Sequence, residues 1–307
     1  MYGRVFKSTG SWYDVRTEDD KSYPCRLRGK FKLKGFKVTN PIAVGDFVDF
    51  YLEDNEEETG VINKIFPREN YIIRKAIKKS AHGHIIAANI DQAILIATLS
   101  FPETSLGFID RFLVTAETFR IPVLLVFNKS DLLRVQEIEK VNEVMEMYEG
   151  IGYPCYLISA LDEKSMDQFS TLIKGKTSLI SGHSGVGKST LLNNIIPEIN
   201  QKTKEISQFA KKGVHTTTFA EMFAVDDNSF LIDTPGIKEL GLVEIGNEEL
   251  YHYFPEMRAF IGQCKFHNCT HTHEPKCAVL EAVEAENISL SRYYSYMSML
   301  EGEDNRR

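Results

Sequence analysis

The order of two short segments constrains the fold of this 307-residue chain more than any other feature. Residues 182–189 read Gly-His-Ser-Gly-Val-Gly-Lys-Ser and fit the pattern GxxxxGKS, in which backbone N–H groups close around phosphate oxygens. Such a loop leaves a buried strand and enters a helix, and residues 177–181 and 188–193 have the patterns of those elements. Residues 128–131, Asn-Lys-Ser-Asp, precede the loop in the chain. The two segments together predict an α/β domain whose site elements occur in an unusual order.

Residues of this loop have predicted roles at a nucleotide. Lys188 would contact the β and γ phosphates, and the Ser189 hydroxyl would bind Mg²⁺. An apolar run leads into residues 233–236, Asp-Thr-Pro-Gly, a DxxG element. There Asp233 would hold Mg²⁺ through water, and the Gly236 N–H would contact the γ-phosphate. The full set expected around the phosphates is Gly182, His183, Ser184, Gly185, Val186, Gly187, Lys188, Ser189, Thr190 and Asp233.

The Asn-Lys-Ser-Asp segment is typical of sites that read guanine. The Asp131 carboxylate can accept hydrogen bonds from guanine N1–H and the exocyclic amine, whereas adenine has neither donor in that place. A site built on such bonds rejects an analogue that lacks them by about 10⁴-fold. Asn128 would hold the loop and touch the base edge, and Lys129 would lay its stem along the base. Ser159-Ala160 would supply a backbone N–H for the guanine oxygen.

The motif order predicts a circularly permuted GTPase, because most GTPases carry the phosphate loop before the guanine element. Residues 213–218, Gly-Val-His-Thr-Thr-Thr, lie where switch I is expected, and one threonine there would complete the Mg²⁺ shell. Thr217 is the first candidate and Thr216 the next. Ile237 follows the DxxG element, and an apolar side chain does not orient a water molecule. His215 is the nearest group for that task, with a merely solvated loop histidine as the alternative.

Three regions follow one another along the chain. Residues 1–70 contain short predicted strands separated by Gly, Asn, Asp and Pro, a rhythm that fits a small β-barrel such as an OB-fold. Residues 71–245 alternate apolar strands with helical patterns, as in an α/β P-loop domain. Residues 246–307 contain a cysteine and histidine cluster followed by helical sequence. We therefore expect a multidomain protein with a barrel, a permuted GTPase domain and a mostly helical metal-binding domain.

The cysteine cluster predicts a structural zinc site. Cys264, Cys269, His271 and Cys277 have the spacing C-x₄-C-x-H-x₅-C, and three thiolates with one imidazole suit a closed tetrahedral Zn²⁺ shell. A full protein shell leaves no position for substrate, so one structural ion is expected. His267 and His273 are rival ligands, and unligated cysteines are the other alternative.

Charge and composition bear on partners and location. The net charge of −7 gives no general attraction to nucleic acid, but residues 21–40 contain seven Lys or Arg and no acid. Lysines neutralise phosphates and aromatic rings stack on bases, so this segment predicts RNA binding by the barrel, with a solvated loop as the alternative. The basic candidates are Arg26, Arg28, Lys30, Lys32, Lys34, Lys37, Arg74, Lys75, Lys78, Lys79, Lys211 and Lys212. No apolar run is long enough for a membrane span and no signal peptide is evident, so we expect a cytoplasmic protein, and a monomer.

These motifs together resemble the circularly permuted GTPases of the RsgA family, also called YjeQ or YloQ. The resemblance covers essentially the whole chain: NKxD, Ser-Ala, GxSGVGKS, GxHTT and DTPG occur in that order, between a β-rich segment and a Cys-Cys-His-Cys cluster. It implies an OB-fold, a permuted G domain and a zinc domain, with Mg²⁺ accompanying GTP. It also implies a late role in assembly of the small ribosomal subunit, with GTP hydrolysis stimulated by that subunit.

The resemblance also bears on single residues. The family's histidine in GxHTT matches His215, and its switch I threonine matches Thr217. The family has an apolar residue after DxPG, with which Ile237 agrees, and it favours His271 as the fourth zinc ligand. Two other functions remain open on the residues alone. One is an RNA-binding scaffold whose nucleotide is structural, and the other is a P-loop ATPase or kinase, against which the NKSD segment argues.

Overall fold

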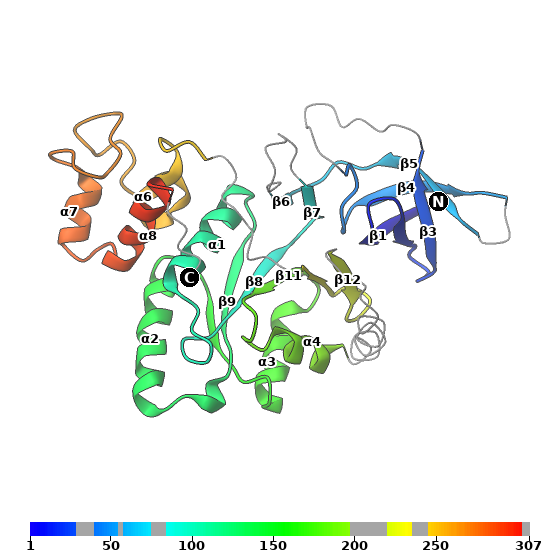
Figure 1. Ribbon diagram of the computed structural model, residues 1–307, viewed down its shortest axis with the longest axis horizontal. Helices are drawn as coiled ribbons and strands as arrows, with labels where there is room; N and C mark the ends of the chain where they lie inside the picture. The colour runs from blue at the N-terminus through cyan, green and yellow to red at the C-terminus, as the bar shows by residue number, and fades with distance from the viewer. Residues whose placement is uncertain (29–39, 55–57, 75–83, 197–219, 235–244, 303–307) are drawn as a thin grey trace, which may run out of the picture.

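The computed structural model describes residues 1–28, 40–54, 58–74, 84–196, 220–234 and 245–302. Three parts follow one another along its long axis: a barrel of strands, a central sheet flanked by helices, and a small helical region (Figure 1). The expected multidomain class is thereby confirmed. None of the helices in these ranges is both long and apolar enough to cross a bilayer.

Five strands form the N-terminal barrel. They are β1 (Tyr2–Ser8), β2 (Tyr13–Arg16), β3 (Ser22–Leu27), β4 (Phe47–Leu52) and β5 (Gly60–Ile65). β1 pairs with both β2 and β4, so the order β1-β2-β3-β5-β4 closes on itself. Alternating residues such as Val5, Val15 and Phe50 fill the interior. Gly60 is required where β5 passes β3, because an added Cβ would lie 2.5 Å from Cys25 Sγ.

A short hairpin lies between the barrel and the central sheet in the chain, and a buried ion pair precedes it. The hairpin consists of β6 (Tyr71–Arg74) and β7 (His84–Ala88) and forms a separate two-stranded sheet. Just before it, the Arg68 guanidinium donates to both carboxylate oxygens of the buried Asp46 at 2.6 Å. A buried charge is tolerated when it is paired and hydrogen-bonded in this way, so the contact fixes the chain where it leaves the barrel.

The central sheet has six strands in the order β10-β9-β8-β11-β13-β12, all parallel except β12. Their bounds are β8 (Gln92–Ala97), β9 (Val123–Phe127), β10 (Cys155–Leu157), β11 (Thr177–Gly182), β12 (Glu221–Ala224) and β13 (Phe230–Asp233). Helices α1 (Leu106–Thr118) and α2 (Val135–Gly150) cover one face, and α3 (Glu163–Ile173) and α4 (Lys188–Ile195) cover the other (Figure 1). Residues of β8 alternate between two separate cores, which explains its continuous apolar sequence.

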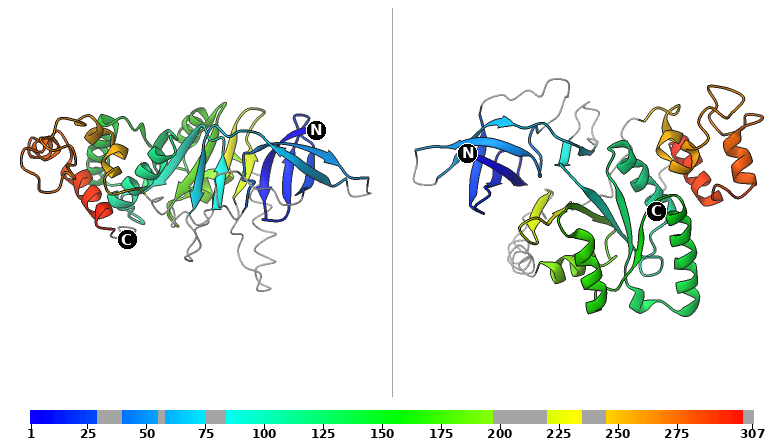
Figure 2. Two further views of the ribbon diagram at one scale, coloured as in Figure 1. Left: turned by 90° about the horizontal axis from the view of Figure 1, so that it is seen from above. Right: turned by 180° about the vertical axis from the view of Figure 1, so that it is seen from behind.

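The barrel and the central sheet are hydrogen-bonded to each other. Strand β1 pairs antiparallel with β12, with Lys7 opposite Glu221, so that the two parts share one eleven-stranded sheet. The view from above shows the strands of both parts following one another along the molecule (Figure 2). The Arg4 guanidinium reinforces this junction by donating to Thr177 Oγ1 at 2.9 Å and to the Asn89 carbonyl at 3.2 Å.

The C-terminal region packs against α1 of the central domain. It contains η3 (Leu250–Tyr253), α6 (Pro255–Arg258), α7 (Ala278–Glu284) and α8 (Leu290–Leu300). Val114 of α1 belongs to the same apolar cluster as Phe254, Met257 and Tyr296. A buried ion pair also joins the two parts, because Arg292 of α8 donates to Asp110 of α1 at 2.6 Å. The helical region is therefore attached by both apolar and ionic contacts.

Candidate nucleotide site and metal centre

The predicted nucleotide residues within the described ranges meet at one edge of the central sheet. Strands β8, β9, β11 and β13 are parallel, so their carboxyl ends lie together, where ligands of open α/β sheets bind. Asn128 follows β9, the phosphate loop follows β11, and Asp233 ends β13. The strand order β9-β8-β11-β13 therefore brings the Asn128 segment, the phosphate loop and Asp233 to the same edge of the sheet, although their order along the chain is permuted.

One buried side chain joins three predicted elements. Asn128 is 3% exposed; its amide nitrogen donates to the Val186 carbonyl at 2.8 Å, and its amide oxygen accepts from Ala160 N–H at 3.0 Å. Gly187 has φ 92° and approaches so closely that an added Cβ would lie 2.3 Å from Asn128 Nδ2. The asparagine therefore ties the guanine element, the Ser-Ala element and the phosphate loop together.

The other residues that were predicted to contact guanine lie at the same edge of the sheet as Asn128. Lys129 has a left-handed backbone with φ 68°, and its ammonium donates to the Phe101 carbonyl at 2.7 Å. Asp131 is exposed and accepts from the Ser159 hydroxyl at 2.5 Å. This bond orients the carboxylate and leaves its other oxygen available for a base.

The phosphate loop has an exposed rim and a buried anchor. Ser184, Gly185, Ser189 and Thr190 are exposed, whereas Val186 is fully buried in the core beneath the loop. The Lys188 ammonium forms an ion pair with the Asp233 carboxylate. The residues predicted to hold phosphate and Mg²⁺ are therefore in direct contact.

The loop between β8 and α1 contributes residues that the sequence motifs did not indicate. Phe101 accepts the Lys129 bond, and Pro102 lies 3.2 Å from the position of an added Cβ on Gly185. In the first turn of α1, the ring of Phe108 packs at a tilt against His183, with 3.7 Å between centroids. In the sequence, the position of this loop could have indicated a role in binding. The loop follows a buried strand, and loops after parallel strands form the ligand-binding edge of such a sheet.

Several predicted residues lie outside the described ranges. These are His215, Thr216, Thr217, Gly236 and Ile237, together with the basic residues Lys30, Lys32, Lys34, Lys37, Lys75, Lys78, Lys79, Lys211 and Lys212. Arg26 and Arg28 are described and exposed, and Arg26 pairs with Glu53 at 2.5 Å.

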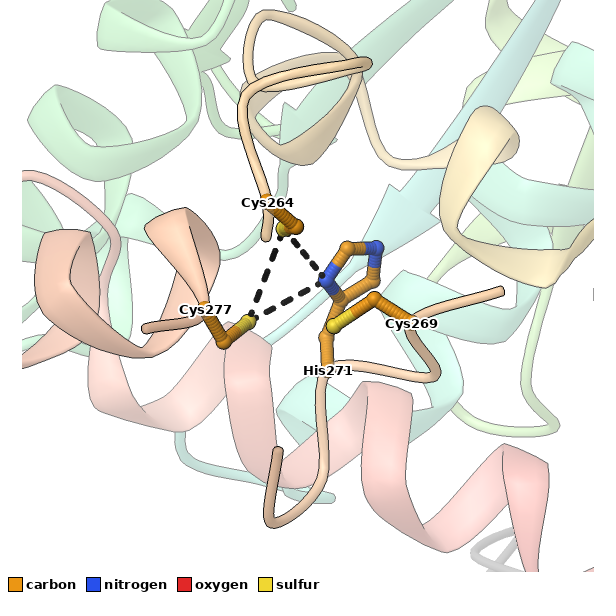
Figure 3. A group of neighbouring side chains, drawn as sticks. All are labelled: Cys264, Cys269, His271 and Cys277. Carbon is orange, nitrogen blue, oxygen red and sulfur yellow. Dashed lines mark hydrogen bonds between the residues drawn. The ribbon is translucent and has the colours of Figure 1, made fainter. Parts of the chain in front are cut away.

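The cysteine cluster forms a compact group of four donors (Figure 3). Cys264, Cys269, His271 and Cys277 place their ligand atoms within 4.8 Å of one another. The Sγ atoms of Cys264 and Cys277 are 3.8 Å apart, and His271 Nδ1 lies 3.6 Å and 3.3 Å from them. Zinc–sulfur bonds of about 2.3 Å in a tetrahedron put two sulfurs about 3.8 Å apart, so the spacing fits Zn²⁺.

Burial and exposure separate the four cluster residues from the neighbouring histidines. Burial raises the pKa of Cys269 to about 12, which keeps the thiol protonated at neutral pH unless a bound metal ion compensates the charge of the thiolate. His267 and His273 are exposed and lie outside the cluster, which leaves His271 as the histidine of the site.

A carboxylate shapes the loop that carries two of these ligands. Glu274 accepts hydrogen bonds from Thr270 N–H at 2.6 Å, Thr270 Oγ1 at 2.7 Å and Thr272 N–H at 3.0 Å. Burial alone would raise the pKa of Glu274, but these hydrogen bonds lower it well below the ordinary value. The charged carboxylate therefore holds the backbone on both sides of His271.

Replacing Glu274 with alanine is expected to weaken zinc binding by about 10- to 100-fold, because groups that orient ligands contribute that much to metal affinity. Competition between the protein and a chromogenic chelator measures the effect. Glu281→Ala, which removes an exposed carboxylate of α7, is the matched control and should leave the affinity unchanged. Equal zinc affinity in both variants would refute the positioning role.

Comparisons with known proteins agree with this architecture. A family model described as RsgA GTPase matches residues 65–243, and one described as RsgA N-terminal domain matches residues 2–62. A protein of Cytophaga hutchinsonii is 54% identical over 307 residues, covering 100% of both chains, and one of Christiangramia forsetii is 53% identical over 306 residues, covering 99% of this chain and 97% of its own. Both are named small ribosomal subunit biogenesis GTPase RsgA.

Two solved structures share the fold. YjeQ from Thermotoga maritima is 37% identical with a TM-score of 0.76, and covers 100% of this chain and 99% of its own. YloQ, described as a circularly permuted GTPase, is 31% identical with a TM-score of 0.74, and covers 100% of this chain and 96% of its own. A circularly permuted GTPase, the class predicted from the order of the motifs, is therefore found among the similar solved structures.

Proposed function

Because the chain belongs to the RsgA family of P-loop GTPases, we propose that it binds the small ribosomal subunit through rRNA and hydrolyses GTP during late maturation of that subunit. The products are GDP and phosphate, and the subunit stimulates the reaction. The observation that most supports this proposal is the position of Asn128, whose buried side chain joins the predicted guanine-reading segment to the phosphate loop and to Ala160.

Each of the three parts of the chain has its own proposed role. Residues 1–70 bind RNA, residues 71–245 bind and hydrolyse GTP, and residues 246–307 hold one structural zinc ion. Asp131, Lys129 and the Ser159-Ala160 backbone read the base, and the loop from Gly182 to Thr190 holds the phosphates. Mg²⁺ would be held by Ser189, Thr217 and, through water, Asp233.

Side-chain and backbone groups of the protein promote hydrolysis at the γ-phosphate in this proposal. Mg²⁺, when bound, neutralises charge that develops on the phosphate oxygens. Lys188, which pairs with Asp233 in the structure, would contact the β and γ phosphates of a bound nucleotide, and Asp233 would then be free to hold the ion through water. His215 orients the attacking water, and the Gly236 N–H binds the γ-phosphate.

The proposal is tested by GTP turnover titrated with purified small and large ribosomal subunits. We expect small subunits to raise the turnover rate and large subunits to leave it unchanged. An RNA-binding scaffold with a structural nucleotide would instead show the same slow turnover under every condition, which would overturn the proposal.

The role of His215 is tested separately. His215→Ala should slow GTP hydrolysis by on the order of 10²-fold, because positioned proton-transfer groups contribute at least that much. GTP affinity should stay within about twofold, since the histidine contacts the water and not the nucleotide in this scheme. Single-turnover kinetics and calorimetry give the two values. A large loss of affinity would make His215 a structural residue instead.

A further inference from the structure

Strand β12 connects the barrel directly to the magnesium end of the nucleotide site. In the sheet register Lys7 of β1 lies opposite Glu221 of β12, and Glu221 lies opposite Asp233 of β13. Asp233 in turn carries the ion pair with Lys188 of the phosphate loop. Four charged residues from the barrel, the sheet and the phosphate loop thus form one row across the strands.

Neighbouring residues place this row on a single face of the sheet. Met222 and Ile232, adjacent to Glu221 and Asp233, belong to the core on the α1 and α2 side. Side chains of successive strand residues point to opposite faces, so Glu221 and Asp233 both point to the α3 and α4 side. This is the side of α4, which begins at Lys188.

The charges in the row depend on one another. Directly opposite residues of an antiparallel pair have Cβ atoms about 5 Å apart, where two like charges are destabilising. The Lys7 ammonium neutralises Glu221 at 3.2 Å, and Lys188 neutralises Asp233. Their side chains are 17% to 33% exposed, so solvent screens them less than free surface charges.

We propose that the Lys7–Glu221 ion pair is the contact through which the barrel acts on the magnesium site, with both residues as positioning residues. This inference rests on the proposed stimulation by the small subunit. A barrel held by the subunit fixes β1, and β1 fixes Glu221 through the pairing and the ion pair. With its charge compensated by Lys7, Glu221 does not compete with Asp233 for Mg²⁺ or for Lys188.

The test uses the full-length protein with Lys7→Met. Basal turnover at saturating Mg²⁺ and GTP affinity should stay within about twofold, whereas the stimulated rate should fall by about fivefold, the upper range for one partly exposed ion pair. Subunit affinity, measured by co-sedimentation, should not change. Lys7→Arg should retain stimulation, because a guanidinium can also pair with Glu221.

A matched control separates this role from general loss of barrel charge. Lys64→Met removes an exposed lysine of β5 that lies over the Phe66 ring, outside the basic segment of residues 21–40. It should be stimulated like the wild type. Full stimulation of Lys7→Met, or a fall that is explained by weaker subunit binding, would overturn the inference and make Lys7 an ordinary surface or RNA-contacting residue.

The Mg²⁺ dependence of basal turnover tests the role of Lys7 independently of stimulation by the subunit. Without subunits, loss of the Lys7 charge makes the site more negative, so the Mg²⁺ concentration for half-maximal turnover should fall about two- to fivefold. An unchanged Mg²⁺ midpoint in Lys7→Met would contradict the coupling. Absence of stimulation in the wild-type protein would instead refute the proposed function and leave this measurement to decide the role of Lys7.

Discussion

Asp131→Asn is expected to lower GTP affinity by about 10⁴-fold and to create affinity for xanthosine triphosphate. In the proposed site the carboxylate would accept from two guanine donors, and an asparagine amide would present a donor in place of one acceptor. Xanthine carries an oxygen in place of the exocyclic amine of guanine, so it matches the new donor. Calorimetry with GTP, ATP and xanthosine triphosphate measures the change in base preference.

The architecture of the site suits this experiment. The Ser159 hydroxyl donates to Asp131 at 2.5 Å, and an asparagine oxygen can accept the same bond, so the loop should keep its shape. Asp162→Asn is the matched control. Asp162 lies in the same region but caps α3 by accepting from Ser165 N–H at 2.9 Å, and asparagine caps helices equally well. An Asp131→Asn protein that still prefers GTP would place the base elsewhere.

Arg292→Met should lower the free energy of unfolding by about 3–5 kcal/mol, the usual cost of removing one partner from a buried ion network. The arginine is 1% exposed and donates to Asp110 at 2.6 Å and to Glu256 at 2.7 Å. Asp110 also accepts from Tyr148 at 2.7 Å. Without Arg292, two buried carboxylates would lack their shared cation. Denaturant unfolding followed by circular dichroism measures the loss.

Two further variants test the physical reason. Arg258→Met breaks the pair between Arg258 and Glu117, which is 3.3 Å long with the arginine half exposed, and should cost at most about 1 kcal/mol. The triple variant Arg292→Met, Asp110→Leu, Glu256→Met removes the buried charges together. It should be more stable than the single variant, because an apolar replacement leaves no uncompensated charge. Equal losses in the single and triple variants would show that packing, not charge, is responsible.

Much of the nucleotide site could be predicted from the sequence because its motifs carry local constraints. The phosphate loop requires glycines at left-handed positions such as Gly187, and it requires a strand before and a helix after. Asn128 was expected to hold the loop, and the structure places it between Val186 and Ala160. The role of Phe101 was not predictable, because it acts through a backbone carbonyl that any residue would supply.

The metal cluster shows the limit of spacing arguments. Three histidines lie close to the cysteines in sequence, and spacing alone did not choose among them. The fold buries His271 beside the sulfurs and against the Tyr251 ring, with 4.5 Å between centroids, while it leaves His267 and His273 exposed. Which side chain faces the cluster depends on the path of the whole loop, including its bonds to Glu274.

Features that depend on residues a few positions apart could be predicted from the sequence alone. They are the phosphate loop, the base-reading segment, the cysteine spacing and the alternating strands. Contacts between distant segments were decided by the packed molecule alone. Arg292 meets Asp110 across 182 positions, and Lys7 meets Glu221 across 214. Pairings over such separations follow from strand order and helix packing, which many sequences share, and no local pattern encodes which two charges will face each other.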